Sequence, residues 1–114
     1  MSEFAVVLIT APAVEAHLIA QALVERKLAA CVNVIAGARS VYRWQGEVRE
    51  VDEAVLVVKT RRAAIPALNE VLRELHSSET PELIAMSIED GSPAYLSWLA
   101  ESVELPDDDQ PYFH

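Results

Sequence analysis

Apolar residues form short continuous runs and helically spaced stripes along this chain. The first run, FAVVLI at residues 4–9, is rich in β-branched residues and predicts a strand covered on both faces. Pro12 follows at a position that suits the first turn of a helix. The next segment predicts a helix over residues 14–28, with one buried stripe of Val14, Leu18, Ala22 and Leu23.

The segments that follow predict a long hairpin. ACVNVI at residues 30–35 is typical of a strand, and Gly37 is expected to bend or bulge it. Pairing resumes at residues 40–44, and Gln45-Gly46 supplies the turn. The return strand, residues 47–59, is polar at first and wholly apolar at AVLVV, which indicates an exposed outer half and a buried inner half.

The rest of the chain predicts one more helix, one more strand and a terminal helix. Pro66 is expected near a helix start, ahead of a loop at residues 76–80 and a strand at residues 83–88. Pro93 introduces the last helix. The inner faces would comprise Ile65, Leu68, Leu72 and Leu75 in the earlier helix, and Leu96, Leu99 and Val103 in the last one.

The order of elements, β-α-β-β-α-β and then a helix, belongs to the α/β (α+β) class. Right-handed crossovers turn it into a ferredoxin-like split βαβ sandwich with a long hairpin between the second and third strands and an extra C-terminal helix. The first and third strands would be central. We expect a single domain over residues 1–104 and an acidic C-terminal tail over residues 105–114.

The predicted hairpin is longer than the helices that would cover it. A helix of fifteen residues spans about 22 Å, whereas a strand over residues 29–44 spans about 50 Å. Val41, Tyr42 and Trp44 near the tip would remain in water, so packing on another copy of the chain is expected. The alternative is a hairpin that curls onto its own sheet or onto the last helix. The residues alone leave dimer and trimer open.

Composition narrows the functional classes. The net charge is −9, with 9 basic and 18 acidic residues, so a face for nucleic acid or for an anionic membrane is not expected. Cys31 is the single cysteine, which excludes an intrachain disulfide and suits a reducing compartment. The N-terminus lacks a basic signal region, and we expect a cytoplasmic protein.

Several segments together resemble the CutA divalent-cation tolerance family over residues 5–103. They are LITAP at 8–12, LAACVNVI at 28–35, SVYRWQGEV at 40–48, Glu53, VVKT at 57–60, TPELIAMSI at 80–88 and YLSWL at 95–99. The resemblance implies a ferredoxin-like fold and a homotrimer whose hairpins complete intersubunit sheets. It also implies a likeness to PII signalling proteins, which bind effectors between subunits, and a role in tolerance of divalent metals, copper especially.

The chain departs from the metal-binding pattern attributed to some bacterial members of that family. Ile9 occupies the cysteine position, Leu75-His76 replaces a histidine pair, and Ser77-Ser78 replaces Pro-Tyr. His76 with Glu82 is the candidate metal site, and a single imidazole predicts weak binding of a divalent cation such as copper. The alternative is a helix-end histidine that interacts with the helix dipole.

The other histidines are weaker candidates. His17 is expected to face solvent. His114, beside the acidic residues 107–109, could capture metals adventitiously.

The residues assigned to an intersubunit cleft or interface are Cys31, Tyr42, Trp44, Glu53 and Lys59. Cys31 is interpreted as a small buried hydrophobe rather than a soft-metal ligand. Tyr42 and Trp44 suit interface packing better than stacking on a ligand. Glu53 and Lys59 would form an ion pair or line a cleft.

The doublet Arg61-Arg62 is a candidate anion-binding site. It would hold an anion or remain solvated, and solvation is the commoner outcome for an unsupported basic pair.

Motifs of common enzyme classes are missing from the sequence. It has no phosphate-binding glycine loop, H-E-x-x-H or nucleophile elbow, and TAPAV at residues 10–14 lacks the glycines and arginine of acylphosphatases. We expect no catalysis and no required cofactor. Three functions remain: metal homeostasis with weak cation binding, a PII-like module for a small effector or partner protein, and a structural trimer that anchors another protein.

Overall fold

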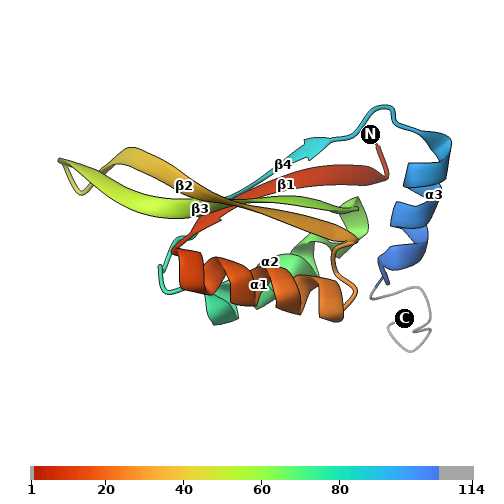
Figure 1. Cartoon of the computed structure of the whole chain (residues 1–114), viewed down its shortest axis with the longest axis horizontal. Coiled ribbons are helices and arrows are strands. Elements are labelled where there is room, and N and C mark those ends of the chain that lie inside the picture. Colours follow the sequence, from red (N-terminus) through yellow and green to blue (C-terminus); the bar gives the residue numbers. More distant parts are fainter. Residues whose placement is uncertain (1, 106–114) are drawn as a thin grey trace.

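The computed structural model describes residues 2–105, which form one four-stranded antiparallel sheet with helices on one face and at one end (Figure 1). The elements are β1 (Phe4–Ala11), α1 (Ala13–Glu25), β2 (Cys31–Trp44), β3 (Glu47–Arg61), a 3-10 turn (Arg62–Ala64), α2 (Ile65–Leu75), β4 (Leu83–Ser87) and α3 (Pro93–Ser102). The strand order is β2-β3-β1-β4, so β1 and β3 are central, as predicted. The ferredoxin-like prediction is confirmed. Of the predicted tail, all but Leu105 lies outside the described residues.

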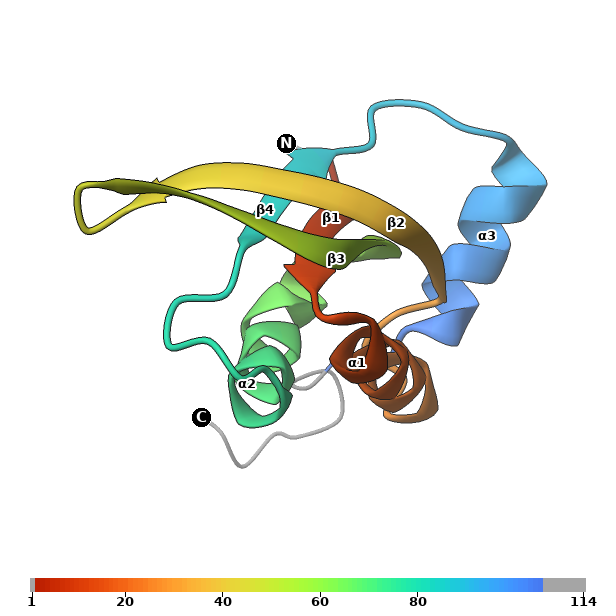
Figure 2. The same ribbon diagram turned by 60° about the vertical axis from the view of Figure 1, so that its left-hand side comes forward.

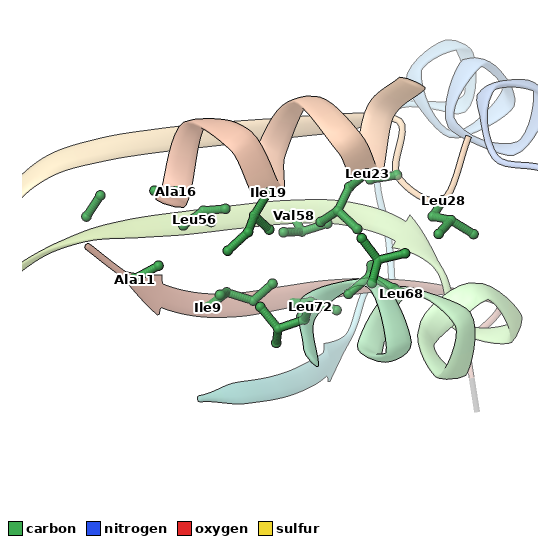
Figure 3. Close-up of a cluster of buried hydrophobic side chains, with 14 residues drawn as sticks. Ile9, Ala11, Ala16, Ile19, Leu23, Leu28, Leu56, Val58, Leu68 and Leu72 are labelled. Carbon is green, nitrogen blue, oxygen red and sulfur yellow. The ribbon is translucent and has the colours of Figure 1, made fainter. Parts of the chain in front are cut away.

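The core lies between the sheet and the helices α1 and α2 (Figure 3). Side chains alternate across a strand, so every second residue of β1 and of inner β3 is buried, including Val7, Ile9, Leu56 and Val58. Ile19 and Leu23 of α1 and Leu68 and Leu72 of α2 pack against them. Each such side chain contributes about 1.5–3 kcal/mol by leaving water.

The predicted buried stripe of α1 is wrong for Val14 and Leu18, whereas Leu23 is buried and Ala22 is partly buried against the core. Ala16, Ile19 and Leu23 face the sheet, whereas Val14 is 76% exposed and Leu18 57% exposed. Apolar residues lie on several sides of this helix, so helical spacing alone does not identify the inner side. The helix ends at Glu25, because Lys27 adopts a left-handed backbone conformation.

The later helices follow the prediction more closely. Pro66 lies in the first turn of α2, and Leu68 and Leu72 are fully buried. Leu99 of α3 and Val103, which directly follows α3, are buried in a second cluster that Phe4 joins, beyond the end of the main core. This cluster holds α3 beside the ends of β1 and β3.

The hairpin of β2 and β3 projects beyond the helices, as predicted (Figures 1 and 2). Its turn has two residues, with φ of 51° at Gln45 and 82° at Gly46, the combination of a type I′ turn. Every residue from Val41 to Arg43 and from Val48 to Glu50 is exposed. In one chain, the outer hairpin therefore lies in water.

A bulge interrupts the pairing of β2 with β3. Ile35 lies opposite Val55, and the next registered pair is Ala38 with Glu53, so β2 carries one extra residue. Gly37 lies there with φ of 85°, a conformation that glycine adopts without strain. The predicted bulge at Gly37 is confirmed.

One face of the sheet has no helix over most of its area. The side chains opposite the buried ones on β1 and β3 are only half-buried, so the prediction that the first strand is covered on both faces is wrong for a single chain. Ile84 on β4 is 53% exposed, Met86 48% and Ile35 on β2 53%. We call this side of the sheet the open face.

Candidate functional site

A groove of about 740 Å³ separates the hairpin from the loop between α2 and β4. The hairpin contributes Ser40, Val41, Tyr42, Trp44, Gln45, Arg49 and Glu53; the loop contributes His76, Ser78, Glu79, Thr80, Pro81 and Glu82; and Thr10 of β1 joins them. The groove exists because the hairpin projects past the helices. Its lining combines the aromatic rings of Tyr42 and Trp44 with the carboxylates of Glu53, Glu79 and Glu82.

Five of the residues selected from the sequence line this groove. They are His76, Glu82, Tyr42, Trp44 and Glu53. Cys31 and Lys59 do not line it; they lie opposite each other in the β2–β3 ladder, nearer the other end of the sheet. The structure thus divides the candidates into two groups.

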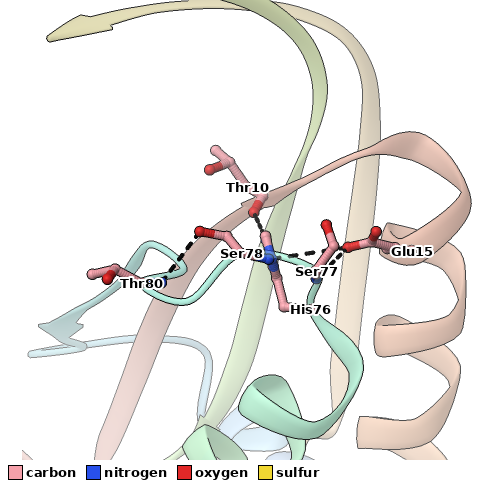
Figure 4. A network of polar contacts seen from close by, with 6 residues as sticks. All are labelled: Thr10, Glu15, His76, Ser77, Ser78 and Thr80. Carbon is pink, nitrogen blue, oxygen red and sulfur yellow. Dashed lines mark hydrogen bonds and ion pairs between the residues drawn. The ribbon is translucent and has the colours of Figure 1, made fainter. Parts of the chain in front are cut away.

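The imidazole of His76 is almost fully buried and both its nitrogens are engaged (Figure 4). Nε2 lies 2.8 Å from the Thr10 carbonyl oxygen, and the Ser78 backbone N–H donates to Nδ1 at 3.0 Å. A carbonyl only accepts and an N–H only donates, so these contacts assign the proton to Nε2. The lone pair of Nδ1 is therefore already occupied.

Glu15 of α1 completes this network. Its Oε1 accepts from the Ser77 backbone N–H at 2.9 Å and lies 3.8 Å from Nδ1 of His76. Partial burial acts to raise the pKa of Glu15, but the Ser77 hydrogen bonds, with the nearby His76, outweigh it and hold that pKa below its ordinary value. His76 is the residue that ends α2, so the network joins both helices to β1.

The groove offers carboxylates rather than a closed set of metal ligands. Glu53, Glu79 and Glu82 line it, and the Thr10 hydroxyl donates to Glu82 at 3.5 Å. Among residues 2–105 of one chain, no three His, Cys, Asp or Glu side chains lie close enough to hold a metal. A selective copper site gathers several nitrogen or sulfur donors, and the described part of one chain does not fit it.

The second group of candidates lies on the open face. Lys59 donates to the side-chain oxygen of Asn33, a neighbour of Cys31 on β2. Glu53 lies six residues from Lys59 along β3, about 20 Å away, so the predicted ion pair between them does not form. Cys31 is half-buried. Burial raises the pKa of Tyr95 on α3, and the nearby Cys31 adds to that rise.

Arg61 and Arg62 have intramolecular partners. Arg61 pairs with Glu3 and donates to the Ala100 carbonyl at 3.4 Å. Arg62 donates to the Ser2 carbonyl at 3.1 Å and to the Ser87 hydroxyl at 2.6 Å. The doublet therefore fastens the N-terminal segment, β4 and α3 to the end of β3, instead of holding an anion or remaining solvated.

Sequence reasoning missed Glu15, Thr10 and Ser78. Thr10 contributes its backbone carbonyl, which any residue type would supply, and Ser78 its backbone N–H, which any residue type except proline would supply. Glu15 could have been noticed only as an acidic residue in the first turn of a helix.

Comparisons with known proteins agree with one another. Residues 5–102 match the family model described as CutA1 divalent ion tolerance protein. The chain is 52% identical over 98 residues to the divalent-cation tolerance protein CutA of Thermus thermophilus, covering 85% of this chain and 95% of that protein. It is 43% identical over 98 residues to the chloroplastic protein CutA of Arabidopsis thaliana, covering 85% of this chain and 54% of that protein.

Solved structures lead to the same group of proteins. The structure of the divalent cation tolerance protein Cut A1 from Thermus thermophilus superposes with a TM-score of 0.87 and 49% identity, covering 89% of this chain and 99% of that one.

In residues 2–105 no helix is both long and apolar enough to span a membrane.

Proposed function

The chain belongs to the CutA1 divalent ion tolerance family, and from that premise we propose that it is a homotrimer that contributes to copper and other divalent-metal tolerance through weak cation binding. The observation that carries the proposal is the groove between the hairpin and the α2–β4 loop, which has three carboxylates and, within the described part of one chain, no closed metal site. A site completed by a neighbouring subunit would bind a cation weakly and reversibly.

Two features support self-association. The open face leaves Ile35, Ile84 and Met86 about half exposed, and the outer hairpin leaves Tyr42 and Trp44 about as exposed. Apolar area of this extent on a soluble domain favours coverage by another protein surface. A copy of the same chain provides one, because exposed hairpin strands and sheet edges pair with each other.

The proposed cation ligands are Glu82 and His76, with Glu79 and Glu53 nearby in the groove. Carboxylates attract divalent cations without selecting copper, which agrees with weak binding. His76 can join them only by giving up the hydrogen bond that Nδ1 accepts from Ser78. Glu82 is therefore the better first target for mutation.

Calorimetric titration with Cu(II) and Zn(II) tests this proposal. Glu82→Gln should lower the affinity of the trimer for both ions several-fold, and Glu70→Gln, an exposed carboxylate on α2 outside the groove, should not. A chain ending at residue 103 separates the contribution of the acidic tail and His114. Unchanged binding in Glu82→Gln would contradict the proposed ligand.

A second candidate function is a PII-like module that binds a small effector or partner protein between subunits. It is favoured by the group on the open face, where Cys31, Lys59 and Asn33 lie together beside α3. Under this alternative, Lys59→Met should weaken effector or partner binding while metal titration is unchanged. A purely structural trimer that anchors another protein would show neither the weaker effector binding of Lys59→Met nor the weaker metal binding of Glu82→Gln.

The proposed role requires neither catalysis nor a cofactor, and we propose a cytoplasmic location. The single cysteine supports a reducing compartment. Family membership does not decide this point, because the Arabidopsis relative is named as chloroplastic. Fractionation of cells that produce the full chain would decide it.

A further inference from the structure

The segment that joins β4 to α3, residues 88–92, has no regular secondary structure and contains the dipeptide Asp90-Gly91. It lies at the end of the molecule away from the hairpin (Figure 1). Both residues of the dipeptide are exposed. Asp90 belongs to neither hydrophobic cluster and does not line the candidate groove. The proposed function therefore leaves this side chain without a role.

The carboxylate of Asp90 contacts the peptide bond that follows it. Its Oδ1 accepts a hydrogen bond from the backbone N–H of Gly91 at 2.8 Å. Because Oδ1 is bonded to Cγ, this contact holds the Gly91 nitrogen beside the carboxyl carbon of the preceding side chain. These two atoms are the ones that join when an aspartate closes a five-membered succinimide ring on its own backbone. Holding reacting atoms together raises the rate of such a step.

The surroundings of the dipeptide leave this ring closure unhindered. Gly91 has no side chain to shield its nitrogen, and glycine allows the backbone a wide range of conformations. Asp90 lies outside every helix and strand, so no ladder fixes its backbone. Within residues 2–105, no backbone carbonyl accepts from the Gly91 N–H. The nitrogen is therefore available to attack Cγ.

Asp52 is an internal comparison that lacks these features. It lies within β3, in register with Arg39, and its carboxylate is 3.3 Å from that guanidinium. The residue that follows it is Glu53, whose side chain flanks the nitrogen that would have to attack. The strand pairing also fixes the backbone on both sides of Asp52. The fold thus exposes one of these two aspartates to ring closure and protects the other.

We propose that Asp90-Gly91 is a self-modification site, at which the chain converts slowly to an isoaspartyl linkage. The Gly91 nitrogen attacks Cγ of Asp90. The N–Cγ bond forms, one carboxyl oxygen leaves as hydroxide, and the N–H proton goes to solvent, so that one water is released. A water then adds to either carbonyl of the ring. Opening at Cγ restores aspartate, whereas opening at the main-chain carbonyl leaves Gly91 attached through the side chain of residue 90.

The net reaction is an isomerisation that leaves the mass unchanged. Water is released in the first step and taken up in the second, so no metal, oxidant or other reactant is consumed. No residue of the candidate groove takes part. Failure of this proposal would therefore leave the proposed trimer and the proposed cation binding unaffected.

The isoaspartyl product would lengthen the main chain directly before α3. It places one additional methylene carbon in the backbone ahead of Gly91. Gly91 lies against Leu96, because a Cβ built on this glycine would be 3.3 Å from that side chain. Ser92, the next residue, caps the helix by accepting the Tyr95 N–H at 3.3 Å. A longer link shifts both contacts, so we expect the first turn of α3 to loosen.

Accelerated ageing of the full chain tests the proposal. The protein is incubated at neutral pH and at a temperature below its unfolding transition, and peptide maps are recorded over time. Chromatography separates the aspartyl and isoaspartyl forms of a peptide, and enzymatic methylation with a labelled methyl donor identifies the isoaspartyl one. We expect isoaspartate at residue 90 to accumulate about tenfold faster than at residue 52, or more. Equal rates at the two positions would overturn the proposal.

Two variants and a denatured sample make the test specific. Asp90→Glu keeps the charge but would have to close a six-membered ring, so the isomer at residue 90 should disappear. Gly91→Ala, with folding checked by circular dichroism, should slow the reaction several-fold because a methyl group flanks the nitrogen. The chain unfolded in guanidinium should react no faster than the folded chain. A much faster reaction after unfolding would overturn the claim that the loop geometry brings the two atoms together.

Hydrogen exchange of the aged chain tests the effect on α3. The amides of Tyr95 and Leu96 should exchange several-fold faster in the isoaspartyl fraction than in fresh protein. The amide of Leu56, in the core strand β3, should exchange at the same rate in both. Unchanged exchange at Tyr95 and Leu96 would overturn the expected loosening.

Discussion

Glu15 and His76 join the start of α1 to the end of α2: Oε1 of the carboxylate lies 3.8 Å from Nδ1 of the imidazole and accepts the Ser77 backbone N–H at 2.9 Å. Because His76 also contacts the Thr10 carbonyl, one buried ring connects both helices with a central strand. The wall of the candidate groove is thus held by side chains whose own hydrogen bonds are complete. The groove is consequently expected to keep its shape when its exposed carboxylates are changed.

Glu15→Gln should lower the free energy of unfolding by about 1 kcal/mol at neutral pH, since a neutral amide accepts more weakly from Ser77. The pKa of Glu15 is below its ordinary value in the folded chain, so its contribution is complete above the ordinary value and is lost as pH falls through the folded one. The difference between wild type and variant should shrink below about pH 4. Urea denaturation at several pH values measures it.

The control for this prediction is Glu70→Gln, whose carboxylate is exposed and 3.9 Å from Arg73. We expect it to change stability by less than about 0.5 kcal/mol. A Glu15→Gln difference that grows on acidification would contradict the sign derived above.

His76→Ala should lower the free energy of unfolding by about 1–3 kcal/mol, because the Ser78 N–H loses its acceptor and the Thr10 carbonyl its donor. Chemical denaturation measures the loss. Glu82→Ala, on the same groove but exposed, is the matched control and should be near neutral. Equal stabilities of the two variants would show that the ring does not hold the groove wall.

Gly46→Ala should destabilise the hairpin by about 1 kcal/mol, because Gly46 has φ of 82° and a side chain there strains the backbone. A Cβ at this position meets nothing within 4 Å, so the effect is conformational and not steric crowding. Gly46→Asn should recover part of the loss, since Asn tolerates this conformation. Thermal unfolding of the wild type, Gly46→Ala and Gly46→Asn distinguishes backbone strain from steric crowding.

Trp44→Ser should weaken the proposed trimer, because this ring is 44% exposed in one chain and its burial would supply about 1.5–3 kcal/mol per subunit. Light scattering over a dilution series should show dissociation at a higher concentration than in wild type. Val14→Ser, on the outer side of α1, serves as the control and should dissociate like wild type. A wild-type chain that remains monomeric throughout would contradict the trimer itself.

The sequence predicted the topology because its strongest signals are local. The Gln45-Gly46 turn, the bulge glycine and the apolar run at residues 54–58 each fix one element without help from distant residues. The inner side of α1 could not be obtained this way. Helical spacing fits Leu18 and Ile19 equally well as inward-facing residues of α1. Only contact with β1 and β3 selects Ile19 over Leu18.

The candidate site was predictable by residue type and not by arrangement. Five predicted residues meet in one groove because the hairpin passes in front of the α2–β4 loop. Cys31 and Lys59 belong elsewhere, as a neighbouring pair in the ladder. The network around His76 depends on backbone groups of Thr10 and Ser78, which carry no signal in the sequence.

The extra residue in β2 is absorbed without changing the side of the sheet that the aromatic rings face. Before the bulge, odd-numbered residues of β2 share a side with Val55 and Val57; after it, even-numbered ones do, and these include Tyr42 and Trp44. Deleting Gly37 would remove the irregularity, and because Tyr42 stays opposite Arg49 and Trp44 opposite Glu47, both rings would keep their side. The pairing across the two-residue turn, and not the number of residues in β2, thus sets the orientation in which a neighbouring subunit would meet the rings.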